Sequence, residues 1–438
     1  MAMVMQPVSS WGRLTHAAHD VIALADRDRV GAVVAASRTP SLAYGNGRSY
    51  GDVCLNESGV LWTTRGLDRF IAFDPASGRL ACEAGVTLDE IIEMALPQGW
   101  FPAVTPGTRF VTVGGAVAND VHGKNHHGAG TFSDHVDALT LQRTDGTTIV
   151  CSREREADWF RATVGGLGLT GLITSLEMRL RPVDGGWIET TTTPFESLDA
   201  FYALADAAST RDEYTVAWID CSGSRGGALR GLFFAGRHAA SNAALPSTRR
   251  RAVPLTPPLS LVTPLSVRWF NRLYYRQHST APAATRQDYR TFFYPLDAVL
   301  DWNRIYGPRG FYQYQCVVPQ AVQRDATREL LDLIAASGTG SFLAVLKTFG
   351  DRPSAGLLSF PIAGTTLALD FPNRGAATLD LFERLDRCVA AAGGRLYAAK
   401  DARMPAALFK AGYPEWRAFE AFRDPGISSQ MARRLFGH

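Results

Sequence analysis

The sequence lacks the features that mark secreted, zinc-binding or membrane-spanning proteins. Its six cysteines are scattered and form no Cys-x-x-Cys pair, which argues against a disulfide framework or zinc knuckle and favours reduced thiols. No run of about 18 apolar residues occurs, so we expect no transmembrane helix. The opening "MAMVMQPVSSWGRL" has neither the basic region nor the apolar run of a signal peptide. We therefore expect a cytoplasmic protein with at most peripheral membrane contact, and the periplasmic face stays open.

A strong excess of one charge is also missing. The chain has 45 basic and 42 acidic residues and a net charge of +3, which argues against a nucleic-acid partner. It is 46% hydrophobic and 20% charged, an ordinary globular composition. A single core usually stops growing near ~250–300 residues. The 438 residues therefore predict two domains.

Apolar periodicity predicts an α+β organisation for the first part of the chain. Residues 20–37 show helical periodicity, and residues 87–98 predict a helix that Thr87 caps with Glu90 at its third position. Asp145-Gly146 predicts the turn of a hairpin over 137–152. Short strands and one more helix are expected around these elements, at 41–45, 60–64, 70–74, 79–85, 157–166 and 171–183.

From about residue 184, strand patterns dominate. They occur at 186–195, 213–220, 228–237, 310–319, 341–350, 356–362 and 365–372, with helices at 320–336 and 376–393. This order predicts an antiparallel sheet covered by helices. The tail from about 395 is polar and helical in pattern.

Residues 241–285 differ from both parts and predict a long loop or lid. They hold three consecutive arginines and several prolines, followed by "RWFNRLYYRQ". Helical spacing would place Trp269, Phe270, Leu273 and Tyr274 on one side and Arg268, Arg272 and Arg276 towards the other. Two interpretations stay open: an interfacial segment that meets anionic lipid or covers a lipidic substrate, and a helix packed on the second domain.

Three glycine-rich stretches could hold a ligand. In "GNGRSYGD", residues 45–52, a strand runs into a turn whose N–H groups suit a pyrophosphate, with a tight surface turn as the alternative. "GLGLTG", residues 166–171, matches G-x-G-x-x-G, but a helical segment precedes it and a strand follows. A Rossmann nicotinamide site needs the order strand, loop, helix, so we reject that site here.

The third stretch, "PGTRFVTVGGAVANDVHGKNHHGAG", covers residues 106–130. His122 and His126 have the spacing of metal ligands only if they share a helix, and Gly123, Asn125, Gly128 and Gly130 argue against one. The favoured interpretation is a second cofactor-cradling loop, with no metal. Three such stretches in 130 residues suit a large cofactor extended along the first domain.

These motifs carry a resemblance. "GNGRSYGD", residues 106–127, "ATVGGLGLTG" and "YAAKDAR" are similar to the vanillyl-alcohol-oxidase or PCMH-type FAD proteins, and within them to the decaprenylphosphoryl-β-D-ribose 2′-oxidase family. The likeness covers nearly the whole chain, including "SWGR", "YPLDAVLDWNRIYGPRGFYQYQ" and "MARRL". It implies an α+β, two-domain fold: an FAD-binding domain at 1–183 completed by 395–438, and a substrate-binding domain at 184–394 with a flexible lid at 241–285.

The resemblance also implies site residues. The FAD contacts would be Gly45, Asn46, Gly47, Arg48, Ser49, Tyr50, Pro106, Gly107, Thr108, Thr112, Val113, Gly114, Gly115, Asn119, His122, Gly123, Gly168, Gly171, Ile173 and Tyr397. The substrate contacts would be Lys124, Gln313, Gln315, Lys347, Thr366 and Ala368. Related oxidases tether FAD through a histidine at the position of Arg48, so we expect non-covalent FAD here.

The implied reaction is oxidation of the 2′-hydroxyl of a polyprenylphosphoryl-ribose, the first half of an epimerisation that makes an arabinose donor for cell-envelope polysaccharide. The hydroxyl must lose a proton, and Lys400, with Tyr50 beside it, is the leading candidate for base or charge stabiliser; a surface lysine at a helix start is the alternative. The implied partners are a lipid-linked phosphosugar, a short-chain NAD(P)-dependent reductase, and a quinone or other electron acceptor.

Two departures from the resemblance weaken the substrate assignment. Where the mycobacterial members of the family carry a cysteine and an asparagine beside the flavin, this chain has Ala368 and Thr366. We therefore expect resistance to covalent trapping by nitroaromatic inhibitors. A soluble FAD-dependent sugar or alditol oxidase that uses oxygen stays open, as does a flavin-binding subunit that positions a partner reductase.

Overall fold

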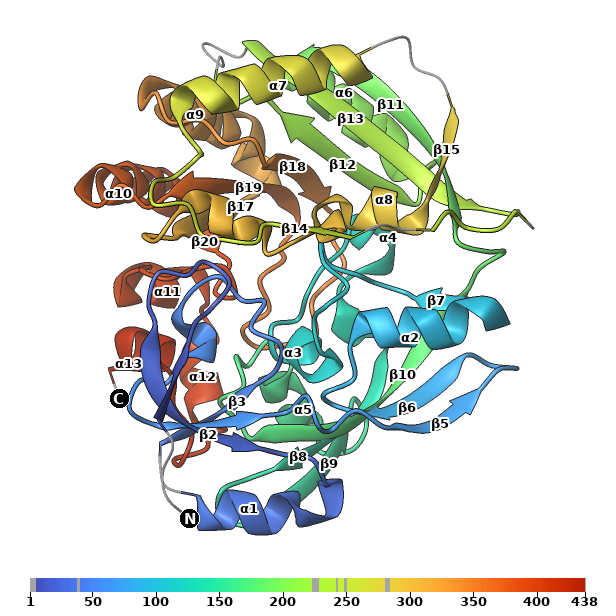
Figure 1. The fold of residues 1–438 in the computed structure, drawn as a ribbon, viewed down its shortest axis with the longest axis vertical. Helices are drawn as coiled ribbons and strands as arrows, with labels where there is room; N and C mark the ends of the chain where they lie inside the picture. Colours follow the sequence, from blue (N-terminus) through green and yellow to red (C-terminus); the bar gives the residue numbers. More distant parts are fainter. Residues whose placement is uncertain are drawn as a thin grey trace.

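Two small sheets and one large sheet form the framework of the molecule (Figure 1). The structure, a computed structural model, describes residues 5–37, 40–222, 228–241, 243–247, 250–279 and 284–437. The first sheet has the order β1 (Met5–Val8), β2 (Ala17–Ala23), β4 (Val60–Thr63), β3 (Ser41–Tyr44). The second has the order β5 (Phe70–Asp74), β6 (Arg79–Glu83), β10 (Leu172–Pro182), β8 (Val136–Gln142), β9 (Thr148–Ser152), with β7 (Trp100–Pro102) paired to β10.

The large sheet has eight strands, and every pairing in it is antiparallel, as the sequence predicts. Its order is β15 (Thr285–Asp288), β11 (Trp187–Ser197), β13 (Ala228–Ala239), β12 (Tyr214–Ile219), β18 (Ala344–Phe349), β19 (Gly364–Pro372), β17 (Phe311–Pro319), β20 (Arg395–Leu396). A two-stranded sheet pairs β14 (Arg251–Ala252) with β16 (Val299–Leu300).

Helices surround these sheets. They are α1 (Val30–Ala36), α2 (Leu88–Ala95), α3 (Val113–Ala118), α4 (His126–Ala129), α5 (Ala157–Thr163), α6 (Leu198–Ser209), α7 (Pro264–His278), α8 (Tyr289–Phe293), α9 (Gln323–Ala336), α10 (Ala376–Ala391), α11 (Ala406–Gly412), α12 (Trp416–Glu420) and α13 (Gln430–Phe436). Within the described ranges, none of them combines the length and apolar character that crossing a bilayer requires.

Several local predictions are confirmed. Helix α2 begins after Thr87, whose hydroxyl accepts from the Glu90 N–H while the Glu90 carboxylate accepts from the Thr87 N–H, a reciprocal capping box. The hairpin of β8 and β9 turns at 143–147. The 166–171 loop follows helix α5 and precedes strand β10, the reverse of the dinucleotide-binding order.

Two local predictions are wrong in whole or in part. Residues 17–23 form strand β2, which lies between β1 and β4, so pairing within the sheet overrides the helical periodicity there; the helical part begins with a 3-10 turn at Arg27–Arg29 and continues as α1. Residues 356–362 form no strand.

The described part of 241–285 contains the fifteen-residue helix α7. The helical spacing that the sequence shows in this segment is therefore confirmed, and the lid stays a prediction.

The register of the large sheet gives its two faces different roles. Residues of β17, β18 and β19 such as Cys316, Leu346 and Leu367 belong to the main core cluster, which also includes apolar side chains of α6, α9 and α10. Alternate residues point to the opposite face. Because Gln313 is opposite Asp370 and Lys347 is opposite Thr366, all four side chains share that face. Polar and ionisable residues therefore line one side of this sheet.

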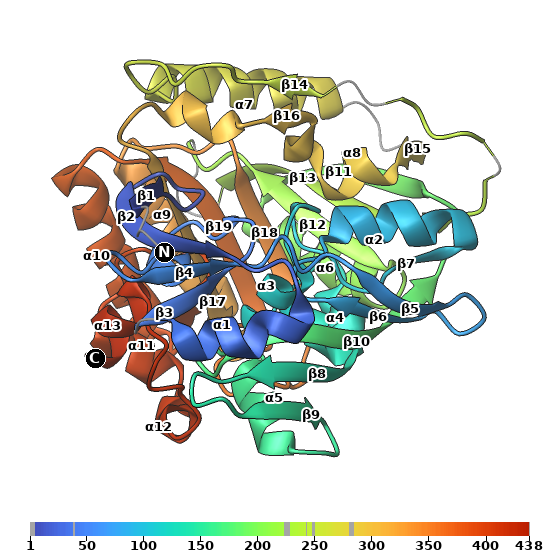
Figure 2. The ribbon, with the colours of Figure 1, turned by 60° about the horizontal axis from the view of Figure 1, so that its bottom comes forward.

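The C-terminal helices lie beside the N-terminal strands (Figures 1 and 2). Arg434 pairs with Asp52 at 2.7 Å, the Gln430 N–H donates to the Leu55 carbonyl, and Ser41 bridges to Ile427. We propose from these contacts that residues 395–438 complete a first domain formed by 1–183, with 184–394 as the second.

Candidate active site

The 45–51 turn contacts two other segments that the sequence predicts to belong to the site. The Asn46 amide donates to the Phe110 carbonyl at 2.7 Å, and a Cβ at Gly45 would lie 2.5 Å from the Thr112 hydroxyl oxygen. On its other side, the Tyr50 N–H donates to the Ala399 carbonyl at 3.2 Å. The turn at 45–51 therefore brings together the 106–112 and 397–403 segments that the sequence singles out.

The conformation of the 45–51 turn is stabilised by Gly47 and by contacts with Trp11. Gly47 has a φ of +59°, which glycine adopts readily. The Arg48 guanidinium lies 4.5 Å from the centroid of the Trp11 ring and donates to the Asn46 carbonyl, and the Ser49 carbonyl accepts from the Trp11 N–H. Arg48 is thus engaged with the chain itself.

His122 stands where the 105–127 segment meets the large sheet. Its ring packs against Phe349 and Tyr397, at 4.8 and 5.5 Å between centroids. Its Nε2 lies 3.1 Å from the Gln315 amide, and its Nδ1 lies 3.2 Å from the Lys347 ammonium. Gln315 also contacts the Thr366 hydroxyl at 3.3 Å. The structure thus joins a residue predicted to contact FAD with three predicted to contact substrate.

The surroundings of His122 define its protonation. Burial and then the Lys347 charge lower its pKa well below the ordinary value, so the ring is neutral. A neutral imidazole donates from one nitrogen and accepts at the other. The Gln315 amide nitrogen and the Lys347 ammonium are both donors that face this ring, so the neutral ring accepts from one of them at a time.

Lys400 and Tyr50 meet a third ionisable group, Asp370. The Lys400 ammonium lies 4.0 Å from the centroid of the Tyr50 ring. Asp370 is fully buried; its Oδ1 accepts from Gln313 at 2.7 Å, and its Oδ2 has no partner among the described residues. Burial raises the pKa of Asp370 to about 7 and lowers that of Lys400 to about 8, while each charge opposes the other's shift.

Sequence reasoning missed Asp370. A signal for it exists, because Thr366, Ala368 and Asp370 alternate along one strand and so share the face of Gln313 and Gln315. An aspartate in a strand core, where burial without a partner is costly, is a functional candidate in its own right.

The site has more positive than negative side chains. Burial and then a neighbouring lysine lower the pKa of Lys124 and of Lys347 to about 7. Lys124 donates to the Phe292 carbonyl and lies 4.4 Å from the centroid of the Phe292 ring. Among the described residues, Asp370 is the one carboxylate that acts on any of these lysines. Since partly buried ammonium groups require a counter-charge, the arrangement suits an anionic ligand.

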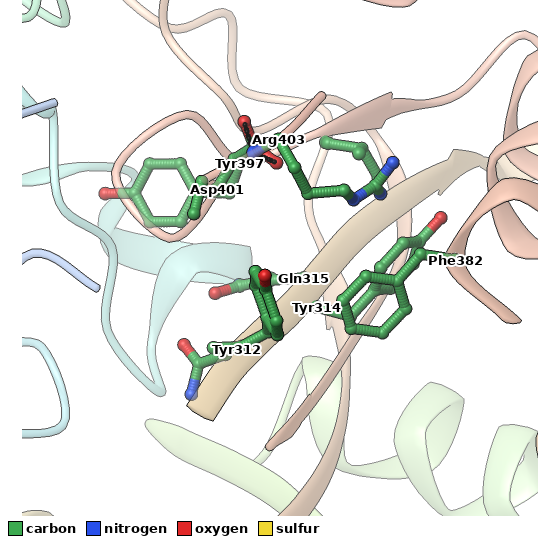
Figure 3. A pocket seen from close by; sticks show the side chains of 10 residues that line it. Tyr312, Tyr314, Gln315, Phe382, Tyr397, Asp401 and Arg403 are labelled. Atoms are coloured by element: carbon green, nitrogen blue, oxygen red, sulfur yellow. Dashed lines mark hydrogen bonds between the residues drawn. The ribbon is translucent and has the colours of Figure 1, made fainter. Parts of the chain in front are cut away.

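A narrow cavity borders this group. It lies between β17 and the 396–403 segment, and Gln313, Gln315, Tyr397, Asp401 and Arg403 are among its lining residues (Figure 3). Gln315 and Tyr397 therefore face both the cavity and His122.

The residues on the first-domain side fit an extended cofactor. A Cβ at Gly107 or Gly168 would meet no atom of the described chain within 4 Å, so both leave open space. The Asn119 Oδ1 is buried and has no partner among the described residues, next to a loop whose Leu167 N–H donates to the Ala118 carbonyl. The Tyr397 hydroxyl donates to the Asn119 carbonyl at 2.9 Å. An orphaned acceptor beside open glycines is the kind of cradle that FAD would fill.

Other residues predicted to contact FAD or substrate pack within the protein or cap a helix, which the sequence does not show. A Cβ at Gly114 would lie 2.9 Å from the Cβ of Ala84, and a Cβ at Gly123 would lie 2.9 Å from the Thr105 carbonyl oxygen. These two glycines therefore allow close packing within the chain itself. Val113 and Ile173 belong to the core cluster of the second sheet. Gly171 adjoins Leu141, and Thr112 caps helix α3 by accepting from the Gly115 N–H. Pro106, Thr108 and Ala368 are half-buried.

The other two histidines of the loop have separate positions. Helix α4 begins at His126, so His122 shares no helix with it. His126 is buried against Phe349 and its pKa is lowered to about 3, chiefly by burial, while His127 contacts the Asp212 carbonyl. In the described ranges no group of three or more His, Cys, Asp or Glu side chains is placed to hold a metal ion.

Comparison with known proteins identifies the class to which the chain belongs. Residues 20–152 match the family model described as an FAD binding domain, which makes the chain a flavoprotein of the FAD-dependent oxidoreductase class. The chain is 36% identical to decaprenylphosphoryl-β-D-ribose oxidase of Mycolicibacterium smegmatis, over 97% of this chain and 96% of that protein. It belongs to the decaprenylphosphoryl-β-D-ribose oxidase family.

Two further relatives match different shares of this chain. An uncharacterized protein of Streptomyces coelicolor is 35% identical over 80% of this chain and 100% of its own length. Mouse L-gulonolactone oxidase is 28% identical over 32% of this chain and 31% of its own length. The likeness to the decaprenylphosphoryl-β-D-ribose oxidase thus extends through the large sheet, where Lys347 and Asp370 lie.

Proposed function

We propose that this protein oxidises the 2′-hydroxyl of a polyprenylphosphoryl-β-D-ribose, or a closely similar lipid-linked sugar, to the 2′-keto form with non-covalent FAD. The observation that carries the proposal is that Lys124 and Lys347 share the site while the single carboxylate among the described residues, Asp370, acts on Lys400. A phosphodiester supplies the missing negative charge, whereas a free alditol does not. The full-length relative acts on a substrate of that class by its name.

The cofactor residues fit non-covalent binding. Gly107, Gly168 and Asn119 would hold FAD along the first domain, and the 45–50 turn would hold its phosphates. Arg48 stands where related oxidases carry the tethering histidine, and both ring nitrogens of His122 already contact side chains. FAD, when bound, supplies the hydride acceptor.

The remaining roles are assigned to side chains of the large sheet and of the three segments that pack against it. Lys400, with a pKa of about 8, accepts the proton of the substrate hydroxyl. The charge of the buried Asp370 raises that pKa. Tyr50 positions Lys400 through contact with its ring. Lys347 and Lys124 bind the phosphate, and Gln313 and Gln315 bind sugar hydroxyls from one strand face.

The proposed chemistry needs further proteins. A 2′-ketone becomes an epimer when a short-chain NAD(P)-dependent reductase returns hydride to the other face. A quinone or another electron acceptor reoxidises the flavin. We propose both as partners.

Anaerobic mixing tests the proposal. The FAD-loaded protein is combined with polyprenylphosphoryl-ribose of several chain lengths, and in parallel with free ribose and alditols. We expect the oxidised flavin absorbance to bleach with the lipid-linked phosphosugar alone. Bleaching with free alditols instead would favour a soluble alditol oxidase, and no bleaching with any sugar would favour a flavin-binding subunit.

A further inference from the structure

Helix α7 presents an exposed apolar face. Leu265, Trp269 and Leu273 recur at four-residue spacing and are 72%, 77% and 60% exposed, while Val267 and Asn271 are buried on the opposite side. The segment before the helix continues this surface with Leu255, Leu259 and Leu261, all exposed. Soluble proteins expose single apolar side chains freely, but a contiguous row of large ones marks an interaction site.

The charge on this surface has one sign. Arg268, Arg272 and Arg276 flank the apolar row, are exposed, and form no ion pair with any described residue. The chain has 42 acidic residues, yet none occurs between Asp220 and Asp288. A surface that combines exposed leucine and tryptophan with unpaired arginines is complementary to an anionic, partly apolar partner.

The inner side of α7 is firmly attached. The Asn271 amide donates to Asp220 Oδ1 at 2.8 Å and to the Ser341 carbonyl at 3.2 Å, and Tyr274 packs on Trp218. Thr263 and Ser266 form a capping box at its start. The exposure of the outer face is therefore a property of an anchored helix.

The attachment also connects α7 to the candidate active site. Val262 and Val267 belong to the same buried cluster as Tyr50. The Ser341 hydroxyl accepts from the Asp370 N–H at 3.2 Å. Helix α7 is thus joined to the surroundings of Tyr50 and Asp370 through Val267 and Ser341, and it lies at the outer edge of the molecule in both views (Figures 1 and 2).

We propose that α7 and residues 255–262 form a membrane-docking surface that lies in the plane of an anionic lipid bilayer. The leucines and Trp269 would enter the boundary between headgroups and acyl chains, and the arginines would contact lipid phosphates. A second copy of the chain fits less well, because a symmetric contact would press this arginine-rich face against itself. Docking would bring the bilayer next to the wall of the site formed by Tyr50. The proposal extends the proposed function but stands without it.

Vesicle flotation tests the surface with the full-length, FAD-loaded protein. We expect it to float with phosphatidylcholine vesicles that contain phosphatidylglycerol, to remain unbound with pure phosphatidylcholine, and to be released by high salt. Replacing Arg268, Arg272 and Arg276 together by Glu should weaken binding at least a hundredfold, since each basic side chain near such a surface contributes about fivefold. Trp269→Ala with Leu273→Ala should weaken it about a hundredfold, since each buried large apolar side chain contributes about tenfold.

The matched control reverses two exposed arginines elsewhere. Arg384→Glu with Arg387→Glu on α10 should leave vesicle binding unchanged. Flavin absorbance and thermal unfolding verify that each variant is folded. Equal flotation of the wild type and the α7 variants would overturn the proposal. So would light scattering that shows a dimer which the α7 variants dissociate. Since flotation uses no sugar, failure of the proposed oxidation would leave this result unaffected.

Discussion

The part of the candidate active site that would bind FAD and the part that would carry out the chemistry are formed by different chemical groups. The part that would bind FAD is mainly backbone: Gly107 and Gly168 leave space, and the 45–51 turn is held by contacts with Thr112 and Trp11. The catalytic part consists of ionisable side chains whose pKa values burial has shifted: Lys347 and Asp370 come from the large sheet, and Lys124 and Lys400 come from the first domain. Backbone groups do not titrate near neutral pH, so cofactor binding should be nearly independent of pH while the chemistry should not.

This contrast implies that substitutions can impair FAD binding and catalysis separately. Changes on the glycine side should weaken FAD binding. Changes of the ionisable side chains should leave FAD bound and impair reduction or substrate binding. The following predictions probe that separation, beginning with the largest effect.

Lys400→Ala should reduce the rate of anaerobic flavin reduction by about a thousandfold while FAD stays bound, since general base catalysis contributes about 10²–10⁴. Stopped-flow absorbance with the lipid-linked phosphosugar measures the rate. Lys400→Arg keeps the charge but cannot act as a base near neutral pH, so we expect the same loss. A nearly normal rate in the arginine variant would show that Lys400 stabilises charge, and a normal rate in the alanine variant would remove it from catalysis.

Gly168→Ala and Gly107→Ala should each raise the dissociation constant of FAD about thirtyfold, because the new methyl group occupies space that the cofactor needs. Fluorescence titration of the apoprotein with FAD measures this constant. Gly146→Ala is the matched control for Gly168→Ala, since both glycines have a positive φ and open surroundings, and Gly146 lies in the hairpin turn. Equal FAD affinity in all three variants would place the cofactor elsewhere.

Lys347→Met should raise the KM for the phosphosugar about tenfold, since a hydrogen bond to a charged group is worth about 1.5–3 kcal/mol. The pKa of Lys347 is about 7, and the cation is the form that binds phosphate. Wild-type affinity should therefore weaken as the pH rises above 7, and the variant should keep only the part of this dependence that Lys124 contributes. An unchanged KM would assign phosphate binding to other side chains.

Asp370→Asn should shift the pH profile of flavin reduction by a smaller amount, towards lower pH. The Asp370 charge raises the pKa of Lys400 from the value that burial alone would set, so its removal lowers that pKa. The neutral base is then available at lower pH, and the rate rises earlier as pH increases. A shift towards higher pH, or none, would contradict the assigned pairing.

Much of the site's framework could be predicted from the sequence. The capping box at Thr87, the hairpin at Asp145-Gly146 and the alternation of Gln313 and Gln315 depend on residues a few positions apart. The order of helix and strand around 166–171 rejected a nicotinamide site for the same reason. The resemblance pointed to Lys400 and Tyr50, which the structure places in contact.

Other features could not be predicted in this way. Strand β2 depends on β1 and on β4, which is some 40 positions along the chain. Asp370 acquires its significance from Lys400 and Gln313, which come from other segments. The exposure of Trp269 depends on which side of α7 the buried Asn271 holds against Asp220 and Ser341.

The amino-acid sequence by itself determined the glycine turns, the helix caps, the strand alternation and the supply of lysines, because these depend on neighbouring residues and on composition. Tertiary structure alone decided which lysines share a site with too few carboxylates, how far their pKa values move, and which side of α7 faces solvent. Burial and electrostatic coupling act between residues hundreds of positions apart, and only the folded chain brings those residues together.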